Sequence, residues 1–415
     1  MERVVATYEI ESPLSIEEAA SVLAGEQSSG TFVTLPGETT ALKEAFGARI
    51  ERIEHKETAP APSLPGGFPP VKGYARAQVD ISWPWENFGH NLPTLIATIQ
   101  GNLYELRQVT GLKLVDLVIP ESFSRPFPGP RFGVKGSRQA VGVENRPLIG
   151  TIIKPSIGLS PQDTANLVAE LAAAGIDFIK DDELMANAPH SSLEQRVDAV
   201  MKVINDHAMR TGKRLIYAFN ISDEIDAMHR HYDHIVAAGG TCAMFSLNSV
   251  GFVAGKSICD RGELIIHGHR NGWGMLNRHP AIGIEFPAYN KLWRLAGVDH
   301  MHVNGIDNKF CESNASVVRS IKDCQQAFLQ GEPPLPVISS GQWGGQAPET
   351  YRLTQTTDLL YQAGGGIMAH PKGPAAGVRS LKLWWHAAVE GLNAERALET
   401  YPDLRPSWEK FAPTQ

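Results

Sequence analysis

The chain has 415 residues, a length that fits two or three domains. Its 42% hydrophobic and 20% charged residues are ordinary for a globular protein and argue against intrinsic disorder. With 38 basic and 45 acidic residues the formal net charge is −7, so the chain lacks the basic surface that nonspecific nucleic-acid binding requires. No apolar run is long enough for a membrane span, and the N-terminus, MERVV, alternates like a strand instead of a signal peptide. We therefore expect a cytoplasmic protein.

Residues 1–135 mix strand and helix patterns and are predicted to form an N-terminal α+β domain. Ser15 followed by Glu18 is a capping-box pattern that starts an alanine-rich helix, and a second helix is predicted over Thr94–Leu106. Pro- and Gly-rich runs predict a loop at Ala59–Pro70 and a domain linker at Phe123–Gly136. Strands are expected at Val4–Ile10, Gly30–Leu35, Ala48–Glu54, Ala75–Trp83 and Leu112–Pro120.

Residues 136–415 have a different rhythm, which predicts a (β/α)8 barrel. Short, fully apolar runs alternate with helix patterns such as Pro161–Ala174, and this is typical of parallel βαβ units. Eight such runs in about 270 residues fit a closed barrel better than an open sheet. The predicted strands are Leu148–Lys154, Ile176–Lys180, Leu215–Asn220, Ala243–Asn248, Leu264–His267, Val298–Val303, Val337–Ser340 and Tyr361–Met368.

Polar residues follow the second of these strands, at the end where a barrel places its chemistry. The run is Lys180, Asp181, Asp182 and Glu183, and strand geometry puts Lys180 and Asp182 on one side. Glu183 joins them only if the chain turns after Asp182. Such a run is usually a solvated acidic turn, but the apolar residues before it predict that Lys180 emerges inside the barrel mouth. A lysine that CO2 converts to a carbamate becomes an oxygen ligand, and with two carboxylates it would suit Mg²⁺.

The fifth predicted strand ends in His267, Gly268, His269 and Arg270, which allows two interpretations. Two imidazoles on one side of a strand could bind zinc, whereas Arg270 beside them could bind a phosphate through its planar fork. Barrel hydrolases with a zinc pair carry the HxH motif before the carbamylated lysine, and the reversed order here disfavours zinc. The glycines at 364–366 precede a helix pattern and offer backbone N–H groups to a second anion.

Two motifs, taken with these strand ends, resemble the RuBisCO superfamily. They are GTIIKP at residues 150–155 and GIDFIKDDE at residues 175–183, and the likeness covers essentially the whole chain. The resemblance implies a ferredoxin-like N-terminal domain before the barrel, a Mg²⁺ site made by carbamylated Lys180 with Asp182 and Glu183, and a homodimer or an oligomer of dimers. The implied roles are general base for Lys154, catalytic histidine for His269, phosphate binding for Arg270, His302, Gly364 and Gly365, substrate contact for Ser340, and contact with the active site of the partner subunit for Glu26, Thr31 and Asn102.

Departures from RuBisCO separate this chain from a CO2-fixing enzyme. The family's Lys-Pro-Lys is Lys154-Pro155-Ser156 here, and the missing amine was both a charge and a proton donor. Productive carboxylation of ribulose bisphosphate is therefore not expected. Further replacements are Trp273 for a histidine, Phe32 for a tryptophan and Gln342 for a glycine.

Lys309, seven residues after His302, matches the family's mobile-loop lysine. In RuBisCO that lysine stabilises the carboxylate of the added CO2, whereas the family's methionine-salvage enolases only move a proton. We expect Lys154, Lys180, His269 and Lys309 to catalyse a reaction of a phosphorylated keto-sugar acid through an enolate. The leading hypothesis is 3-oxo-isoapionate 4-phosphate, converted by transfer of its carboxyl group and hydrolysis to 3-phosphoglycerate and glycolate.

Two other functions stay open from the sequence. One is a 2,3-diketo-5-methylthiopentyl-1-phosphate enolase or a methylthioribulose-phosphate isomerase, which would exchange a proton without cleaving a C–C bond. The other is a noncatalytic regulatory homologue. The complete metal triad argues against the latter, because unused buried carboxylates beside a lysine are costly to keep.

Overall fold

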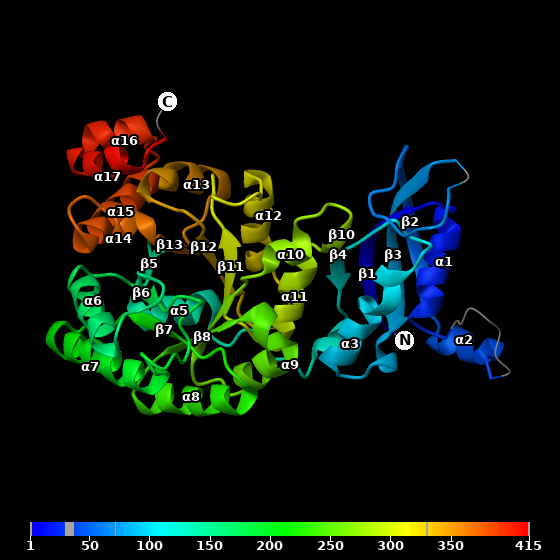
Figure 1. Cartoon of the computed structure of the whole chain (residues 1–415), viewed down its shortest axis with the longest axis horizontal. Coiled ribbons are helices and arrows are strands. Elements are labelled where there is room, and N and C mark those ends of the chain that lie inside the picture. Colours follow the sequence, from blue (N-terminus) through cyan, green and yellow to red (C-terminus); the bar gives the residue numbers. More distant parts are fainter. Residues whose placement is uncertain (1, 30–36, 71, 329–330, 414–415) are drawn as a thin grey trace. The chain divides into compact units, whose positions relative to one another are not determined.

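The computed structural model describes residues 2–29, 37–70, 72–328 and 331–413 (Figure 1). The chain divides into two compact units. Among the residues that the structure describes, no helix has the length and apolar character needed to cross a membrane. The first unit comprises Met1–Pro128 with Gly272–Leu295, and the second comprises Gly129–Asn271 with Ala296–Gln415.

The first unit is built on a five-stranded sheet with the strand order β10-β4-β1-β3-β2. Its chain order β1-α1-β2-β3-α3-β4, with α2 inserted after α1, is the predicted ferredoxin-like arrangement. Ser15 caps α1 by accepting from the Glu18 backbone N–H, as the capping-box pattern indicated. The elements are β1 (Arg3–Ser12), α1 (Ile16–Glu26), α2 (Thr40–Phe46), β2 (Arg49–Ala59), β3 (Tyr74–Pro84), η1 (Trp85–Asn87), α3 (Leu92–Ile99), η2 (Gly101–Glu105), β4 (Gly111–Val118), α4 (Glu121–Ser124), α10 (Trp273–Asn277), β10 (Ile282–Ile284) and α11 (Phe286–Ala296).

Several expected elements of this region differ from the structure. The helix expected over Thr94–Leu106 is α3 followed by the 3-10 turn η2, because Gly101 adopts a φ of 26° that interrupts the α-helix. The expected linker Phe123–Gly136 overlaps α4 and the start of α5 (Gly133–Val141), so only its proline-rich middle is irregular. The strand expected at Gly30–Leu35 lies outside the described residues.

Strand β10 reaches the first sheet from far along the sequence. Ile282–Ile284 pair in parallel with residues 112–114 of β4. The Lys113 ammonium donates to the Asn277 and His279 carbonyls, each at 2.9 Å. The excursion 272–295 therefore belongs to the first unit. The division predicted at residue 135 did not include it, because a strand of 3 residues leaves no periodic pattern.

The second unit is a closed barrel with the strand order β11-β12-β13-β5-β6-β7-β8-β9, and all its strand pairs are parallel. This confirms the predicted (β/α)8 fold class. The strands are nearly fully buried, which explains their continuous apolar runs. They are β5 (Leu148–Ile152), β6 (Phe178–Lys180), β7 (Ile216–Asn220), β8 (Cys242–Ser246), β9 (Ile265–His269), β11 (His300–Asn304), β12 (Leu335–Ser339) and β13 (Leu360–Gln362).

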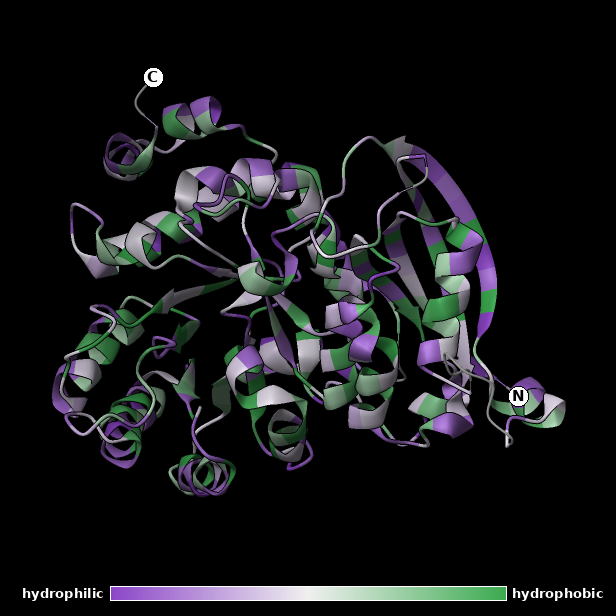
Figure 2. Ribbon diagram, turned by 45° about the vertical axis from the view of Figure 1, so that its right-hand side comes forward, coloured by the Kyte–Doolittle hydropathy of each residue, from purple (hydrophilic) through white to green (hydrophobic). Residues whose placement is uncertain are grey.

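Helices of mixed polarity surround these strands (Figure 2), as expected for elements that pack on one side only. Ser160 and Ser192 cap α6 and α7 with their side chains. The last strand, expected over Tyr361–Met368, ends at Gln362, because the glycines at 364–366 let the chain turn into the short helix α14. The helices of this unit are α5 (Gly133–Val141), α6 (Pro161–Ala173), α7 (Leu193–Thr211), α8 (Ile225–Ala237), α9 (Leu247–Cys259), α12 (Asn314–Gln325), η3 (Gly344–Gln346), α13 (Ala347–Thr354), α14 (Gly365–Met368), α15 (Pro374–Val389), α16 (Ala394–Thr400), η4 (Pro402–Leu404) and α17 (Arg405–Phe411).

The barrel interior changes from apolar to polar along the strand direction. A buried cluster that includes Leu148, Phe178, Ile265 and Leu360 fills the amino-terminal part, and apolar residues of α5 and its flanks pack against it. Side chains two positions further along a strand face the same interior. Those residues are mostly polar and lie towards the carboxyl-terminal end of the barrel, with His267 deeper than the others: Lys180, Asn220, Ser246, His267, Ser339 and Gln362.

Asp299, directly before β11, links three segments at the other end of the barrel. It is 1% exposed. One carboxylate oxygen accepts from the Phe132 and Gly133 N–H groups at 2.6 and 3.0 Å, and the other accepts from the Ile266 N–H at 2.8 Å. Burial raises the pKa of Asp299 to about 6, although these backbone donors favour its ionised form.

Replacing Asp299 with asparagine should lower the free energy of unfolding by about 1–3 kcal/mol. Either orientation of the new amide turns its NH2 group towards a backbone N–H, which leaves a buried donor without an acceptor. Urea unfolding curves would measure the loss. The exposed Asp206→Asn exchange is the matched control, expected within about 0.5 kcal/mol of the unchanged protein. Equal midpoints for the two variants would contradict this account.

Candidate active site

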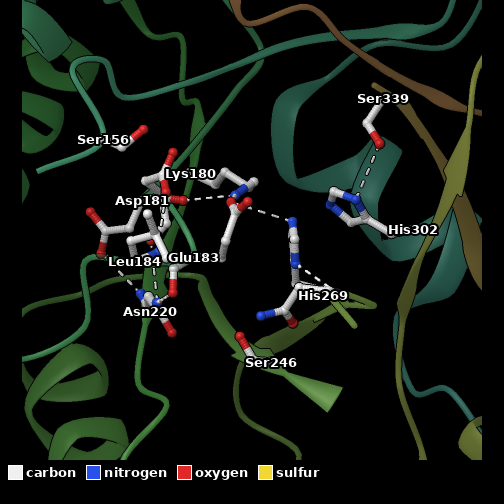
Figure 3. Close-up of polar contacts among 12 residues, drawn as sticks. Ser156, Lys180, Asp181, Glu183, Leu184, Asn220, Ser246, His269, His302 and Ser339 are labelled. Carbon is white, nitrogen blue, oxygen red and sulfur yellow. Dashed lines mark hydrogen bonds and ion pairs between the residues drawn. The ribbon is translucent and has the colours of Figure 1, made fainter. Parts of the chain in front are cut away.

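Lys180 ends β6 at the carboxyl-terminal end of the barrel and is only 1% exposed. Its Nζ donates to the Asp181 carbonyl at 2.9 Å and to Glu183 Oε2 at 3.3 Å (Figure 3). Burial lowers the pKa of Lys180, against the raising effect of the neighbouring carboxylates. A lowered pKa increases the fraction of neutral amine, which is the form that can add CO2.

The chain turns directly after Asp182, so Glu183 returns to Lys180, as the metal hypothesis required. The Leu184 N–H donates to Asp182 Oδ1 at 3.1 Å within this turn. Glu183 Oε2 lies 3.5 Å from His269 Nε2. Burial raises the pKa of Glu183, but the charges of Lys180 and His269 and several hydrogen bonds outweigh it and lower the value to about 2. Glu183 is therefore ionised at neutral pH.

Asp181, for which the sequence suggested no role, anchors this turn from behind. Its carboxylate accepts from the Arg196 guanidinium at 3.1 Å, the Tyr217 hydroxyl at 2.6 Å and the Asn220 backbone N–H at 2.9 Å. The Asn220 amide donates to the carbonyls of the two residues that follow Asp181, at 3.2 and 3.3 Å. Because these bonds come from α7 and β7, they fix the loop that carries the two candidate metal ligands.

Lys154, just beyond β5, contacts the same loop from the neighbouring strand. Its Nζ donates to Asp182 Oδ2 at 2.6 Å and to Ser156 Oγ at 2.7 Å. The Lys154 side chain is 41% exposed, whereas that of Asp182 is 3% exposed. Lys154 thus lies where it can exchange a proton with a molecule bound at the barrel mouth.

The donor set fits a hard divalent cation only with a carbamate. No three His, Cys, Asp or Glu side chains gather as a metal cluster in the described part of the chain. Asp182 and Glu183 supply two carboxylates, and the buried Lys180 amine lies beside them. A carbamate on Lys180 would add the third oxygen ligand and remove the ammonium charge, as Mg²⁺ requires.

His269 faces the metal-ligand loop from β9 (Figure 3). Burial and the Lys180 charge lower the pKa of His269 to about 4, with Glu183 opposing the shift. Its Nδ1 accepts from the Asn271 N–H at 3.3 Å. At neutral pH His269 is therefore an uncharged imidazole at the edge of the site. Because its Nδ1 is the acceptor, its Nε2 carries the proton and faces Glu183.

His267 and His302 lie deeper in the barrel, and each ring nitrogen of both has a protein contact. His267 Nδ1 lies 3.1 Å from His300 Nδ1, and His267 Nε2 lies 2.7 Å from His302 Nε2. His302 Nδ1 lies 3.3 Å from Ser339 Oγ. A zinc ligand needs an available ring nitrogen, so His267 does not fit the zinc interpretation. The phosphate-binding role of His302 stays a prediction.

Arg270 is connected to Ser340 through Asn304, at the end of β11, and Glu312, in the loop that follows. Its Nη2 lies 3.0 Å from Glu312 Oε2, which also accepts from the Asn304 amide at 2.6 Å. Asn304 Oδ1 accepts from the Ser340 hydroxyl at 2.6 Å. Ser340 has a φ of 76°, which is uncommon for a residue with a side chain and is typical of functional sites. The structure thus groups two of the predicted substrate-binding residues.

Lys309 lies in the loop 305–312 after β11. Its backbone N–H donates to the Ser340 carbonyl at 3.2 Å. The amides of Gln342 and Gln346 both donate to the Ile306 carbonyl, at 3.1 and 2.9 Å. Side chains that follow β12 therefore hold the loop, and they bring the Lys309 backbone to the end of β12.

The glycine run after β13 has open surroundings. A Cβ added at Gly365 would meet nothing within 4 Å, and one at Gly364 would meet only Ile152, at 3.3 Å. Gly364 and Gly365 lie at the start of α14, and the first N–H groups of a helix have no acceptor within the helix. Their phosphate-binding role stays a prediction.

Family models test the resemblance directly. The model of the ribulose bisphosphate carboxylase large chain, catalytic domain, matches residues 133–411, and that of its N-terminal domain matches residues 1–123. The chain belongs to the RuBisCO large-chain family.

Relatives of this RuBisCO-family chain match it over almost its full length. A 3-oxo-isoapionate-4-phosphate transcarboxylase/hydrolase of Xanthobacter autotrophicus is 51% identical over 97% of this chain and 98% of its own. A 3-oxo-isoapionate-4-phosphate decarboxylase of Rhizobium etli is 47% identical over 98% of each. The crystal structure of a rubisco-like protein from Burkholderia fungorum has a TM-score of 0.92 at 45% identity and covers 99% of this chain and 100% of that one. Octameric Rubisco of Pyrococcus horikoshii has a TM-score of 0.88 at 30% identity, with coverage of 98% and 93%.

Several N-terminal residues of this RuBisCO-family chain are expected to reach the active site of a partner subunit. Glu26 ends α1 and Asn102 lies in η2, and both side chains are exposed in the single chain. Thr31 and Phe32 lie outside the described residues. Trp273 packs against Tyr289 within the excursion 272–295, with ring centroids 4.8 Å apart.

Proposed function

We propose that this RuBisCO-family chain is a Mg²⁺-dependent enzyme that converts 3-oxo-isoapionate 4-phosphate to 3-phosphoglycerate and glycolate. The identity of 51% over nearly the whole chain with the Xanthobacter transcarboxylase/hydrolase carries the choice of substrate. The grouping of Lys180, Asp182 and Glu183 beside Lys154 supports the chemistry. The protein is not proposed to fix CO2 on ribulose bisphosphate, because Ser156 replaces the second lysine of the family's Lys-Pro-Lys motif.

Three residues would hold the cofactor. Lys180 as a carbamate, Asp182 and Glu183 would bind Mg²⁺, which when bound stabilises negative charge that develops on neighbouring substrate oxygens. Asp181, Arg196 and Asn220 would keep this ligand loop in place, because they bond it from behind.

The remaining side chains would handle protons and the carboxyl group. Lys154, 2.6 Å from Asp182, and His269 would move a proton at the substrate carbons next to the carbonyl. Lys309 would hold the carboxyl group while it leaves one carbon and joins the next, because an ammonium group stabilises a carboxylate. Arg270, Gly364 and Gly365 would bind the phosphate, and Ser340 would contact the sugar-acid chain.

A second candidate is simple decarboxylation of the same substrate, because relatives at 47% and 45% identity are decarboxylases. In that case a proton, instead of the carboxyl group, would add to the carbon skeleton after CO2 leaves. The two candidates share the substrate and differ in the carbon count of the products.

We further propose a homodimer in which Glu26, Thr31 and Asn102 complete the active site of the partner subunit. The exposure of Glu26 and Asn102 in the single chain and the octameric assembly of the Pyrococcus horikoshii Rubisco support this. Mixing an Asn102→Ala chain with a Lys180→Ala chain should restore part of the activity that each homodimer lacks. An absence of restoration in mixed dimers would contradict shared sites.

The substrate assignment is tested by incubating the protein with Mg²⁺, bicarbonate and 3-oxo-isoapionate 4-phosphate and following the products by ¹³C NMR. Glycolate with 3-phosphoglycerate would support carboxyl transfer and hydrolysis, and release of CO2 with a four-carbon sugar phosphate would favour decarboxylation. No turnover by a protein that binds Mg²⁺ and CO2 would overturn the substrate and bring the methylthio-sugar phosphates forward.

A further inference from the structure

A line of hydrogen-bonded side chains runs through the barrel interior beneath the site. Ser137 Oγ, on α5, lies 2.7 Å from His300 Nε2, and His300 Nδ1 lies 3.1 Å from His267 Nδ1. His267 Nε2 lies 2.7 Å from His302 Nε2. His302 Nδ1 lies 3.3 Å from Ser339 Oγ at the end of β12, the contact drawn in Figure 3. We call these five residues the histidine line. All of them are at most 9% exposed.

The histidines of this line are uncharged. Burial lowers the pKa of His300 to about 3 and holds the pKa values of His267 and His302 well below the usual range. A neutral imidazole has one N–H and one acceptor nitrogen. We call each contact between neighbouring members of the line a link. If any of the three rings gained a second proton, two N–H groups would face each other at one of these links. Each link between two rings must therefore contain a single proton.

Ser137 sets the direction of the whole line. Its hydroxyl donates to the Gly133 carbonyl within α5, so its oxygen can only accept from His300. His300 must then carry its proton on Nε2 and accept on Nδ1. His267 must carry its proton on Nδ1, and His302 on Nε2. The Ser339 hydroxyl also has the Val303 carbonyl within reach, at 3.1 Å. Three neutral rings supply only three protons for the four links of the line, so with the Ser137 proton donated to Gly133 the fourth proton comes from Ser339. One serine at the amino-terminal end of the barrel thus determines three tautomers.

We propose that Ser137, His300 and His267 are positioning residues that hold His302 in the Nε2–H tautomer, so that His302 Nδ1 accepts a hydrogen bond from the Ser339 hydroxyl at the barrel mouth. This rests on the internal geometry of the barrel and not on the identity of the substrate.

The direction of hydrogen-bond donation is also fixed for the residues at the barrel mouth. Glu312 accepts from the Asn304 amide, so Asn304 presents its oxygen to Ser340, whose hydroxyl donates to it. Because Ser339 donates to His302 and Ser340 donates to Asn304, both adjacent serines use their hydroxyl protons in hydrogen bonds to the protein. Their oxygens, 3.4 Å apart, keep lone pairs only. The end of β12 would then accept hydrogen bonds from substrate hydroxyl groups and repel carboxylate or phosphate oxygens.

The test is the tautomeric state of the histidines in the resting protein, without any substrate. Protein labelled with ¹⁵N in its histidine rings would be examined by NMR, with His300→Gln, His267→Gln and His302→Gln used to assign the resonances. We expect protonated Nε2 on His300 and His302 and protonated Nδ1 on His267. A protonated Nδ1 on His302, or a doubly protonated ring at neutral pH, would overturn the proposal.

Ser137→Ala is the decisive variant, because it removes the acceptor that sets the direction and touches neither substrate nor metal ligands. We expect His302 to show both tautomers in this variant. Ser137→Thr, which keeps the hydroxyl, should restore the single tautomer. Ser320→Ala, another buried serine on a barrel helix, is the matched control and should leave the line unchanged. An unaltered His302 in a folded Ser137→Ala protein would show that Ser137 does not set the direction, and if that variant does not fold, the unsubstituted protein alone decides.

Discussion

Replacing Lys180 with alanine should lower metal-dependent turnover by about 10³-fold or more. A bound divalent ion contributes several kcal/mol of charge stabilisation, and about 4 kcal/mol corresponds to 10³ in rate. Without Lys180 only the two carboxylates of Asp182 and Glu183 remain, since no cluster of three His, Cys, Asp or Glu side chains exists within the described ranges. Calorimetric titration with Mg²⁺ in the presence of bicarbonate should show the corresponding loss of affinity.

Lys382→Ala provides the control for the Lys180 variant. Lys382 lies on α15, its side chain is 27% exposed, and it is near Asp177 and far in sequence from the ligand loop. This variant should keep its turnover and its Mg²⁺ affinity. Turnover by Lys180→Ala that still depends on both Mg²⁺ and bicarbonate would contradict the carbamate.

Replacing Lys309 with alanine should change which products form. Formation of glycolate and 3-phosphoglycerate should fall by about 10²-fold or more, the loss that follows removal of one charged transition-state donor. Loss of CO2 from the substrate should continue, because Lys154, Lys180 and His269 are untouched. ¹³C NMR of substrate labelled in its carboxyl group would show the label in free CO2 or bicarbonate and no longer in a product.

Lys322→Ala tests whether the effect is specific to Lys309. Lys322 is an exposed lysine on α12, directly after the same loop. It should leave the product ratio unchanged. If Lys309→Ala slowed CO2 loss and product formation in parallel, Lys309 would be required before the carboxyl group moves, and its proposed role would be wrong.

The sequence predicted those features that depend on neighbours along the chain. Continuous apolar runs identified the barrel strands because both faces of such strands are buried, and serines such as Ser160 marked helix starts because their side chains cap nearby N–H groups. The Lys180 to Glu183 run was found because its residues are adjacent. The turn after Asp182 was stated as a condition, and the structure meets it.

Other features depend on contacts between distant residues and left no local signal. Asp181 is bound by residues 15 to 39 positions away, and nothing near it in the sequence names them. The partners of Asp299 and the direction of the histidine line arise in the same way. The α14 helix was mistaken for strand because four residues are too few to show a helical period.

The position of β10 bears on the order in which this protein can fold during synthesis. The first sheet receives its last strand from residues 282–284, so five of the eight barrel strands are made before the sheet can be completed. A nascent chain that ends before residue 282 would present β4 as an open edge, and open edges pair with other chains. The two units thus cannot mature strictly one after the other on the ribosome, as independent domains generally do. Their synthesis is interleaved, and an N-terminal fragment that ends before residue 282 would lack the strand that covers β4.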